Sequence, residues 1–277
     1  MRKFPFALLA AFAVIGCAPT PEAAPTDPAA TKPAESPVET TQTSAPEVKQ
    51  ADKEPAKMPK ITDTKVGKGA PAAKGDKVYM MYKGTIPKTN EEFDSNYAPE
   101  RDVFSLTLGQ GQVIKGWELG IPGMKVGGIR QLEIPSELAY GEAGSPPKIG
   151  PNQDLNFEVK LMFIIKPGEE DTYDAKDLKV GSGRAVKKGD RISVHYTGKF
   201  LNGKVFDSSI PRKEAFEFTV GAGEVITGWD EGVVDMKIGG KRRLILPPNL
   251  AYGPGGNGTI PPDSVLDFDI ELLKILN

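Results

Sequence analysis

Two segments of this chain repeat each other at an offset of 112 residues. Residues 113–128 read VIKGWELGIPGMKVGG and residues 225–240 read VITGWDEGVVDMKIGG, with nine identities in sixteen positions. The correspondence continues on both sides, since Tyr82 matches Tyr196 and Phe157 matches Phe268. This period is too long for a solenoid unit. The sequence therefore predicts two copies of one domain, a first domain over residues 61–166 and a second over residues 174–277.

Apolar and polar residues alternate along much of each copy. Leu266, Phe268, Ile270 and Leu272 alternate with acidic residues, and residues 155–161 repeat the pattern, which is typical of a strand with one buried face. Alternation over residues 78–82 and 192–196 predicts the strand that opens each domain. Only the short segment after each Gly-Trp pair predicts a helix. The expected fold class is α+β, with an antiparallel sheet packed on one helix in each domain.

The N-terminal residues 1–16 are typical of a signal peptide. Arg2 and Lys3 precede an uncharged stretch that is shorter than the roughly 20 residues of a membrane-spanning helix. The sequence Val14-Ile15-Gly16-Cys17 resembles the lipobox of bacterial lipoproteins, which implies cleavage before Cys17 and lipidation, as with palmitate, of its sulfur. An ordinary secretory signal with a chance cysteine is the alternative. The residue after Cys17 is not the aspartate that retains such proteins at the inner membrane, which favours the outer membrane, facing the periplasm.

Residues 17–60 form an expected linker between the lipidated cysteine and the first domain. Pro and Ala dominate this stretch, and Leu, Ile and aromatic residues are absent from it. Such a composition cannot bury enough apolar area to offset the entropy of ordering, so we expect disorder. A spacer is the favoured interpretation, with a proline-rich ligand for a partner as the alternative.

Composition argues against several function classes. The chain has 35 Lys and Arg against 37 Asp and Glu, so no cationic excess is available for a nucleic acid partner. One His and one Cys provide no ligand set for zinc, and we expect no metal and no cofactor. His195 has Met81 as its counterpart, which favours a structural strand histidine over a catalytic base. The alternating Asp267, Asp269 and Glu271 are interpreted as a solvated strand face rather than a cation site.

An aromatic set recurs in both copies. It comprises Tyr82, Phe93, Phe104, Trp117, Tyr140 and Phe157 in the first, and Tyr196, Phe206, Phe216, Trp229, Tyr252 and Phe268 in the second. Such a set alone is more often core than site. Asp207 follows Phe206 directly, however, and Tyr252 borders a Pro/Gly-rich loop, where binding residues concentrate. These polar neighbours favour a small-ligand pocket with aromatic walls.

These residues resemble the FKBP-type peptidyl-prolyl cis/trans isomerases. The motifs that carry the resemblance are V-H-Y-T-G (194–198), F-D-S-S (206–209), E-V-I-T-G-W (224–229), L-A-Y-G (250–253), I-P-P (260–262) and L-D-F-D-I-E-L-L (266–273). The resemblance covers both copies. It implies, in each domain, a five- to six-stranded antiparallel sheet wrapped around one short helix, with a tryptophan at the floor of the pocket. It also implies X-Pro segments as substrates and binding of the macrolides tacrolimus and rapamycin.

The resemblance also assigns site residues by position. In the second domain the implied catalytic residues are Tyr196, Phe206, Asp207, Trp229, Tyr252 and Phe268, and the implied substrate-binding residues are Arg212, Phe216, Glu224, Val225, Ile226 and Ile260. In the first domain the implied substrate-binding residues are Tyr82, Phe93, Asp94, Phe104, Val113, Ile114, Trp117, Tyr140, Ile149 and Phe157. That domain departs from the pattern: Gln112 replaces the glutamate, Lys148 occupies a flap position that is usually aliphatic, and Arg101 matches Arg212 only with an insertion.

The expected function is prolyl cis/trans isomerisation during folding of exported proteins in the bacterial cell envelope. X-Pro bonds exchange slowly because of amide resonance, and their rotation requires no proton transfer, which suits a site without a catalytic base. One alternative is a prolyl-binding chaperone or adaptor with little catalysis, in which the first domain is non-catalytic. A structural lipoprotein on a decayed scaffold is the other. The proline-rich linker offers no dimerisation helix, which favours a monomer.

Overall fold

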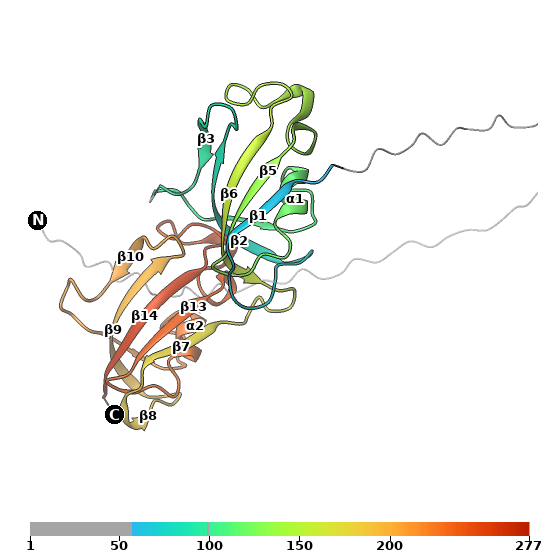
Figure 1. Ribbon diagram of the computed structural model, residues 1–277. Helices are drawn as coiled ribbons and strands as arrows, with labels where there is room; N and C mark the ends of the chain where they lie inside the picture. Colours follow the sequence, from blue (N-terminus) through green and yellow to red (C-terminus); the bar gives the residue numbers. More distant parts are fainter. Residues whose placement is uncertain (1–56, 99, 277) are drawn as a thin grey trace, which may run out of the picture. The chain divides into compact units, whose positions relative to one another are not determined.

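The computed structural model describes residues 57–98 and 100–276 of the chain (Figure 1). The expected signal peptide, the lipidation site Cys17 and the linker up to residue 56 lie outside the described residues. In the described part of the chain, no helix combines the length and apolar character needed to cross a membrane.

The first domain is one antiparallel sheet with a short α-helix. Its elements are β1 (Lys60–Lys65), β2 (Lys77–Thr85), β3 (Glu92–Ser95), β4 (Phe104–Thr107), α1 (Lys115–Gly120), β5 (Ile129–Ile134), two 3-10 helices, η1 (Ser136–Leu138) and η2 (Gly141–Ala143), and β6 (Leu155–Ile165). The strand order is β1-β5-β6-β2-β3, and β4 also pairs with β2 (Figure 1). Strand β6 alternates between buried and half-buried residues throughout, as the sequence predicts.

The second domain repeats this arrangement. It contains β7 (Asp174–Lys179), β8 (Ser182–Ala185), β9 (Arg191–Phe200), β10 (Val205–Ser208), β11 (Phe216–Thr219), α2 (Thr227–Gly232), β12 (Lys237–Ile238), β13 (Lys241–Leu246), η3 (Pro248–Leu250), η4 (Gly253–Gly255) and β14 (Leu266–Ile275). The order β10-β9-β14-β13-β7, with β11 on β9, matches the first sheet, and β8 and β12 form a separate two-stranded sheet. The predicted α+β fold, with six strands in each main sheet, is confirmed.

Two predictions from the sequence are wrong. Each domain opens with an earlier strand, β1 or β7, whose residues KITDTK and DAKDLK are exposed along their whole length. These edge strands bury no face, so they show no apolar alternation. The acidic face of β14 is also not fully solvated, because Asp267 is only 8% exposed and accepts two hydrogen bonds from Arg243, at 2.7 and 2.6 Å.

Glycines allow each short helix to lie directly on the sheet. A Cβ atom on Gly228 would come within 2.6 Å of the Leu246 side chain, and one on Gly232 within 2.5 Å of Leu244. Gly116 and Gly120 stand in the same relation to Ile134 and Leu132 in the first domain. The close approach brings the intervening tryptophan, Trp229 or Trp117, into contact with the remaining aromatic residues.

Candidate active site

The second domain gathers its aromatic set around Trp229, which is fully buried. The ring of Trp229 lies 5.1 Å from Tyr196 and 5.3 Å from Phe268, and both contacts are edge-to-face. Phe206 makes a further edge-to-face contact with Phe268, at 5.6 Å. Phe216 borders Trp229 at 6.1 Å. Aromatic pairs favour this perpendicular geometry, so the rings hold one another in place as the walls of a box.

The first domain forms the same box around Trp117. Tyr82 and Phe157 each lie 5.2 Å from Trp117, and Phe93 lies 5.5 Å from Phe157, all edge-to-face. The box opens into a cavity of about 300 Å³. It is lined by Tyr82, Phe93, Asp94, Phe104, Gly111, Gln112, Val113, Ile114, Trp117, Tyr140 and Phe157. The cavity size and its aromatic lining suit a small apolar ring such as that of proline.

A strand glycine makes room for the phenylalanine walls in each domain. A Cβ on Gly198 of β9 would lie 2.5 Å from Phe206 and 2.8 Å from Phe268. A Cβ on Gly84 of β2 would lie 2.4 Å from Phe93 and 2.9 Å from Phe157. Sequence reasoning missed both positions. The available signal was their recurrence two residues after the pocket tyrosine in each copy.

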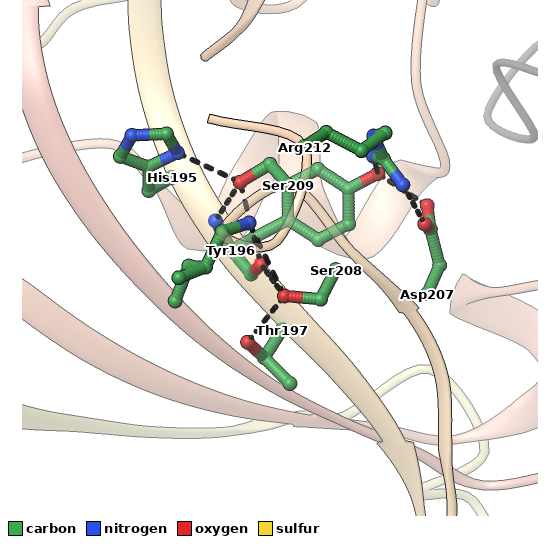
Figure 2. A network of polar contacts seen from close by, with 8 residues as sticks. His195, Tyr196, Thr197, Asp207, Ser208, Ser209 and Arg212 are labelled. Atoms are coloured by element: carbon green, nitrogen blue, oxygen red, sulfur yellow. Dashed lines mark hydrogen bonds and ion pairs between the residues drawn. The ribbon is translucent and has the colours of Figure 1, made fainter. Parts of the chain in front are cut away.

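A carboxylate, a phenol and a guanidinium meet at the aromatic box of the second domain (Figure 2). The Tyr196 hydroxyl donates to Asp207, and Arg212 donates both to Asp207, at 2.6 Å, and to the Tyr196 oxygen, at 3.1 Å. Burial raises the pKa of Tyr196, and the hydrogen bond to Asp207 raises it further. Tyr196 therefore stays a neutral donor at physiological pH, and Asp207 has both a neutral donor and a cation beside it.

The first domain keeps only part of this arrangement. The Tyr82 hydroxyl donates to Asp94 at 2.5 Å, and Asp94 also accepts from the Ser95 amide at 3.0 Å. Arg101 forms no ion pair with any described residue, although its charge lowers the pKa of Tyr82 against the larger raising effect of burial. The β3–β4 connection is one residue longer than its counterpart, and Arg101 does not pair with Asp94 as Arg212 pairs with Asp207.

His195 lies on the opposite side of β9 from the pocket tyrosine and braces the backbone (Figure 2). Its Nδ1 atom is 2.9 Å from the Ser209 hydroxyl oxygen, which accepts the Tyr196 amide hydrogen at 2.9 Å. Ser209 is fully buried. In the first domain Asn96 replaces Ser209 and accepts the Tyr82 amide hydrogen at 2.7 Å. The expected structural role of His195 agrees with these contacts.

Acidic residues in the helices fix the turn that leads into each pocket. Asp230 accepts hydrogen bonds from the amides of Gly221 and Gly223, both at 2.9 Å. Glu118 accepts from Gly109 and Gly111 at 2.6 and 2.8 Å. The side chain of Glu224 accepts the Thr219 amide hydrogen at 3.1 Å, and Gln112 does the same for Thr107 at 3.0 Å. Gln112 therefore makes the same turn contact as Glu224. The hydrogen bonds that Asp230 and Glu118 accept from the turn amides were not predicted from the sequence.

Two hydrogen-bond donors belong to the aromatic box of the second domain or pack against it. Ile226 precedes α2 with an extended backbone, and none of the described residues accepts its amide hydrogen within hydrogen-bond distance. Tyr252 is half-buried, and burial together with the charge of Asp207 raises its pKa to about 12. Both groups are donors at physiological pH. Within the described ranges, no three His, Cys, Asp or Glu side chains come together as a metal site.

The predicted site residues come together in both domains. In the first domain all of them line the cavity except Ile149, which is buried in the adjoining core. In the second domain Tyr196, Val225, Ile226, Trp229, Ile260 and Phe268 belong to one buried cluster, and Phe206, Phe216 and Tyr252 pack against it. Asp207 and Arg212 lie at its polar side, and Glu224 lies on the preceding turn.

Comparison with known proteins identifies the fold family. The family pattern described as FKBP-type peptidyl-prolyl cis-trans isomerase matches residues 68–162 and 182–273, more than half of the chain. Peptidyl-prolyl cis-trans isomerase FKBP9 of Homo sapiens is 38% identical over 205 residues, which cover 73% of this chain and 35% of that protein. FKBP10 of Homo sapiens is 35% identical over 204 residues, with the same coverage.

A fungal relative shows higher identity over a shorter region. FK506-binding protein 4 of Neurospora crassa is 48% identical over 126 residues, 46% of this chain and 26% of that protein. The chain thus spans about a third of the length of FKBP9 and FKBP10. Both matched ranges contain a complete aromatic box with its tyrosine–aspartate pair. The chain belongs to the FKBP-type peptidyl-prolyl cis-trans isomerase family, and it carries two domains of that family.

Proposed function

We propose that the chain catalyses cis/trans isomerisation of X-Pro peptide bonds, with the second domain as its principal site. The observation that carries the proposal is the aromatic box around Trp229, bordered by the Tyr196–Asp207–Arg212 group. Trp229 would underlie the pyrrolidine ring, with Phe206, Phe268 and Tyr196 as walls. A box with aromatic and apolar walls suits the pyrrolidine ring of proline better than a charged side chain.

The barrier to rotation comes from amide resonance and amounts to about 18–20 kcal/mol. Resonance stabilises a planar, polar amide. An environment poor in water therefore weakens the planar form relative to the twisted one. The amide of Ile226 and the hydroxyl of Tyr252 would hold substrate carbonyls, and Asp207 would face the carbonyl that rotates. Hydrogen bonds that fit the twisted state better than the planar state lower the barrier.

Exchange spectroscopy on a short X-Pro peptide tests this proposal. The full chain in catalytic amounts should raise the cis/trans exchange rate, and rapamycin should suppress the increase because it competes for the same box. No increase with folded protein would refute the isomerase assignment and favour the chaperone or adaptor alternative. Suppression of aggregation of an unfolded client would then be the property to measure.

We further propose that the enzyme is lipid-anchored in a bacterial envelope and acts on exported polypeptides as a monomer. The support is the sequence Val14-Ile15-Gly16-Cys17 and the Pro/Ala-rich stretch after it. The relatives named above come from Homo sapiens and Neurospora crassa, so this part rests on the N-terminal residues alone. Labelled palmitate should be incorporated by the wild type and lost in Cys17→Ser. Equal labelling of the two would refute the anchor.

A further inference from the structure

A second hollow adjoins the proline-sized cavity of the first domain. It has a volume of about 590 Å³ and shares Phe93 and Asp94 with the aromatic cavity. A peptide whose proline fills the box would therefore place a neighbouring side chain in this hollow, which we name the side groove. Its charged lining residues are Lys83, Glu92, Asp94, Glu100, Arg101, Lys148 and Glu158.

Three of the four carboxylates that border the side groove already have donors. Glu92 pairs with Lys83 at 3.3 Å, and Asp94 accepts from the Tyr82 hydroxyl. Glu158 accepts from the Tyr97 hydroxyl at 3.1 Å and from Gln131 at 2.8 Å. Only Glu100 receives no hydrogen bond or ion pair from the described residues. Oxygens of Asp94 and Glu158 thus already accept hydrogen bonds from neutral protein donors, and Glu92 is the carboxylate that is paired with a cation.

Two cations of the side groove have no carboxylate partner among the described residues. Lys148 donates to the backbone carbonyl of Phe93 at 2.5 Å, which fixes an ammonium group at the rim of the cavity. Arg101 also forms no ion pair within the described ranges, and its charge acts on the hydroxyl of Tyr82, which lines the aromatic cavity. An ammonium group bound only to a neutral carbonyl can still attract an anion.

The second domain lacks both features. Thr259 occupies the position of Lys148, counted from the matching Ile149 and Ile260. Arg212 is committed to Asp207 at 2.6 Å. Val205 and Ile210, which match Glu92 and Tyr97, are 51% and 59% exposed and give that rim an apolar character. The aromatic boxes of the two domains are alike. The surfaces beside them, which would contact the substrate residues next to proline, are charged in the first domain and more apolar in the second.

We propose that the first domain selects prolyl segments with an acidic side chain adjacent to the proline, with Lys148 and Arg101 as its specificity-determining residues. This inference rests on the proposed function, because it places proline in the aromatic box. It divides the substrates of the chain between its two sites.

The two tryptophans of the chain, one in each box, allow each site to be followed separately. The full chain is labelled with 5-fluorotryptophan, and its two fluorine resonances are assigned with Trp117→Phe and Trp229→Phe. Capped peptides that carry Glu, Gln or Lys beside a single proline are then titrated at low salt. Glu and Gln have the same shape, so their comparison isolates charge.

The Trp117 resonance should respond to the Glu peptide with about three- to tenfold higher affinity than to the Gln peptide, as expected for one or two solvent-exposed ion pairs. The Trp229 resonance should show no preference for Glu. In about 1 M salt, where the screening length is about 3 Å, the Glu preference should disappear. Lys148→Thr and Arg101→Gln should each reduce it. Lys88→Gln removes an exposed lysine outside the groove and should preserve it.

Equal affinity of the first domain for Glu and Gln peptides would overturn the inference and leave the proposed function intact. A Trp117 resonance that responds to none of the peptides would overturn both for this domain. An unchanged Trp117 resonance in the free Lys148→Thr and Arg101→Gln proteins verifies that each variant retains the box. A Glu preference that survives both substitutions would exclude these residues as its source.

Discussion

Arg212 donates to Asp207 at 2.6 Å in the second domain, while Arg101, its nearest counterpart in the first domain, pairs with no described carboxylate. Asp207 is therefore held by a cation as well as by the Tyr196 hydroxyl. In the first domain the tyrosine holds Asp94 without that help. Two boxes with nearly the same ring distances thus differ in the electrostatics of the group that would face a rotating amide.

Removing the guanidinium should slow the second site. Arg212→Ala leaves Asp207 with Tyr196 as its remaining side-chain donor and frees the carboxylate to move. Arg212 is 45% exposed, so we expect a loss of about 1 kcal/mol in transition-state stabilisation, or roughly fivefold in kcat/KM. Turnover is measured in a Phe93→Ala background, in which we expect the first site to be inactive. Arg191→Ala disrupts another exposed ion pair of the same domain and should have no effect; equal losses in the two variants would contradict the account.

Gly198→Ala should disturb the pocket more than its small volume suggests. The new methyl group would lie 2.5 Å from Phe206 and 2.8 Å from Phe268, so both rings must shift. Overpacking of this kind costs about 1–3 kcal/mol of stability. We expect a lower melting temperature and reduced turnover at the second site. Gly255→Ala is the control, since a Cβ there meets no atom within 4 Å. Wild-type turnover in Gly198→Ala would show that the positions of these rings do not matter.

Asp230 should stabilise the turn that precedes Val225 and Ile226, two members of the buried cluster around Trp229. Asp230→Ala leaves the amides of Gly221 and Gly223 without their acceptor, and we expect a loss of about 1–3 kcal/mol in unfolding free energy. The neighbouring Glu231 is exposed, so Glu231→Ala should change stability by less than about 0.5 kcal/mol. Urea unfolding of both variants checks this. Similar midpoints would mean that the turn holds without Asp230.

Acid should weaken the second domain through Asp177. The hydrogen bond from Arg242 holds the pKa of Asp177 below its ordinary value. The folded state therefore binds the proton less readily than the unfolded state, so this contribution to stability is present above about pH 4 and is lost as the pH falls through the lower, folded pKa. Unfolding of wild type and Asp177→Asn is compared at pH 7 and pH 3. The variant should lose less stability than wild type on acidification, and Asp174→Asn, on the same strand, should behave like wild type.

The sequence predicts most of the fold because the chain carries its pattern twice. Alternation over residues 155–161 and 266–272 marks the central strands, and the repeated Gly-Trp marks the helix. Strands β1 and β7 escape prediction since they lie at sheet edges and bury neither face. Their pairing depends on partners that are distant in sequence, such as Asp63 with Arg130 of β5.

The candidate site was predictable in its aromatic members and less so in its supports. The aromatic residues were recognised because they recur at matching positions in the two copies, and the family resemblance assigned each of them a place in the site. Gly198 contributes by leaving room for two phenylalanine rings, and Asp230 contributes by accepting hydrogen bonds from two backbone amides. Neither role produces a periodic pattern in the sequence. The absence of an ion pair between Arg101 and Asp94 could not be predicted either. One inserted residue changes the path of the β3–β4 connection, and the sequence does not show where that change places the Arg101 side chain.

The most direct test of the central claim is turnover of an X-Pro peptide by the full chain with its phenylalanine walls removed. Phe206→Ala should abolish most of the activity, and the Phe93→Ala, Phe206→Ala double variant should leave none. Circular dichroism and the melting transition must show that the variants stay folded. We predict a folded, inactive double variant. Wild-type turnover in a folded double variant would contradict the assignment of the aromatic boxes as the sites of prolyl isomerisation.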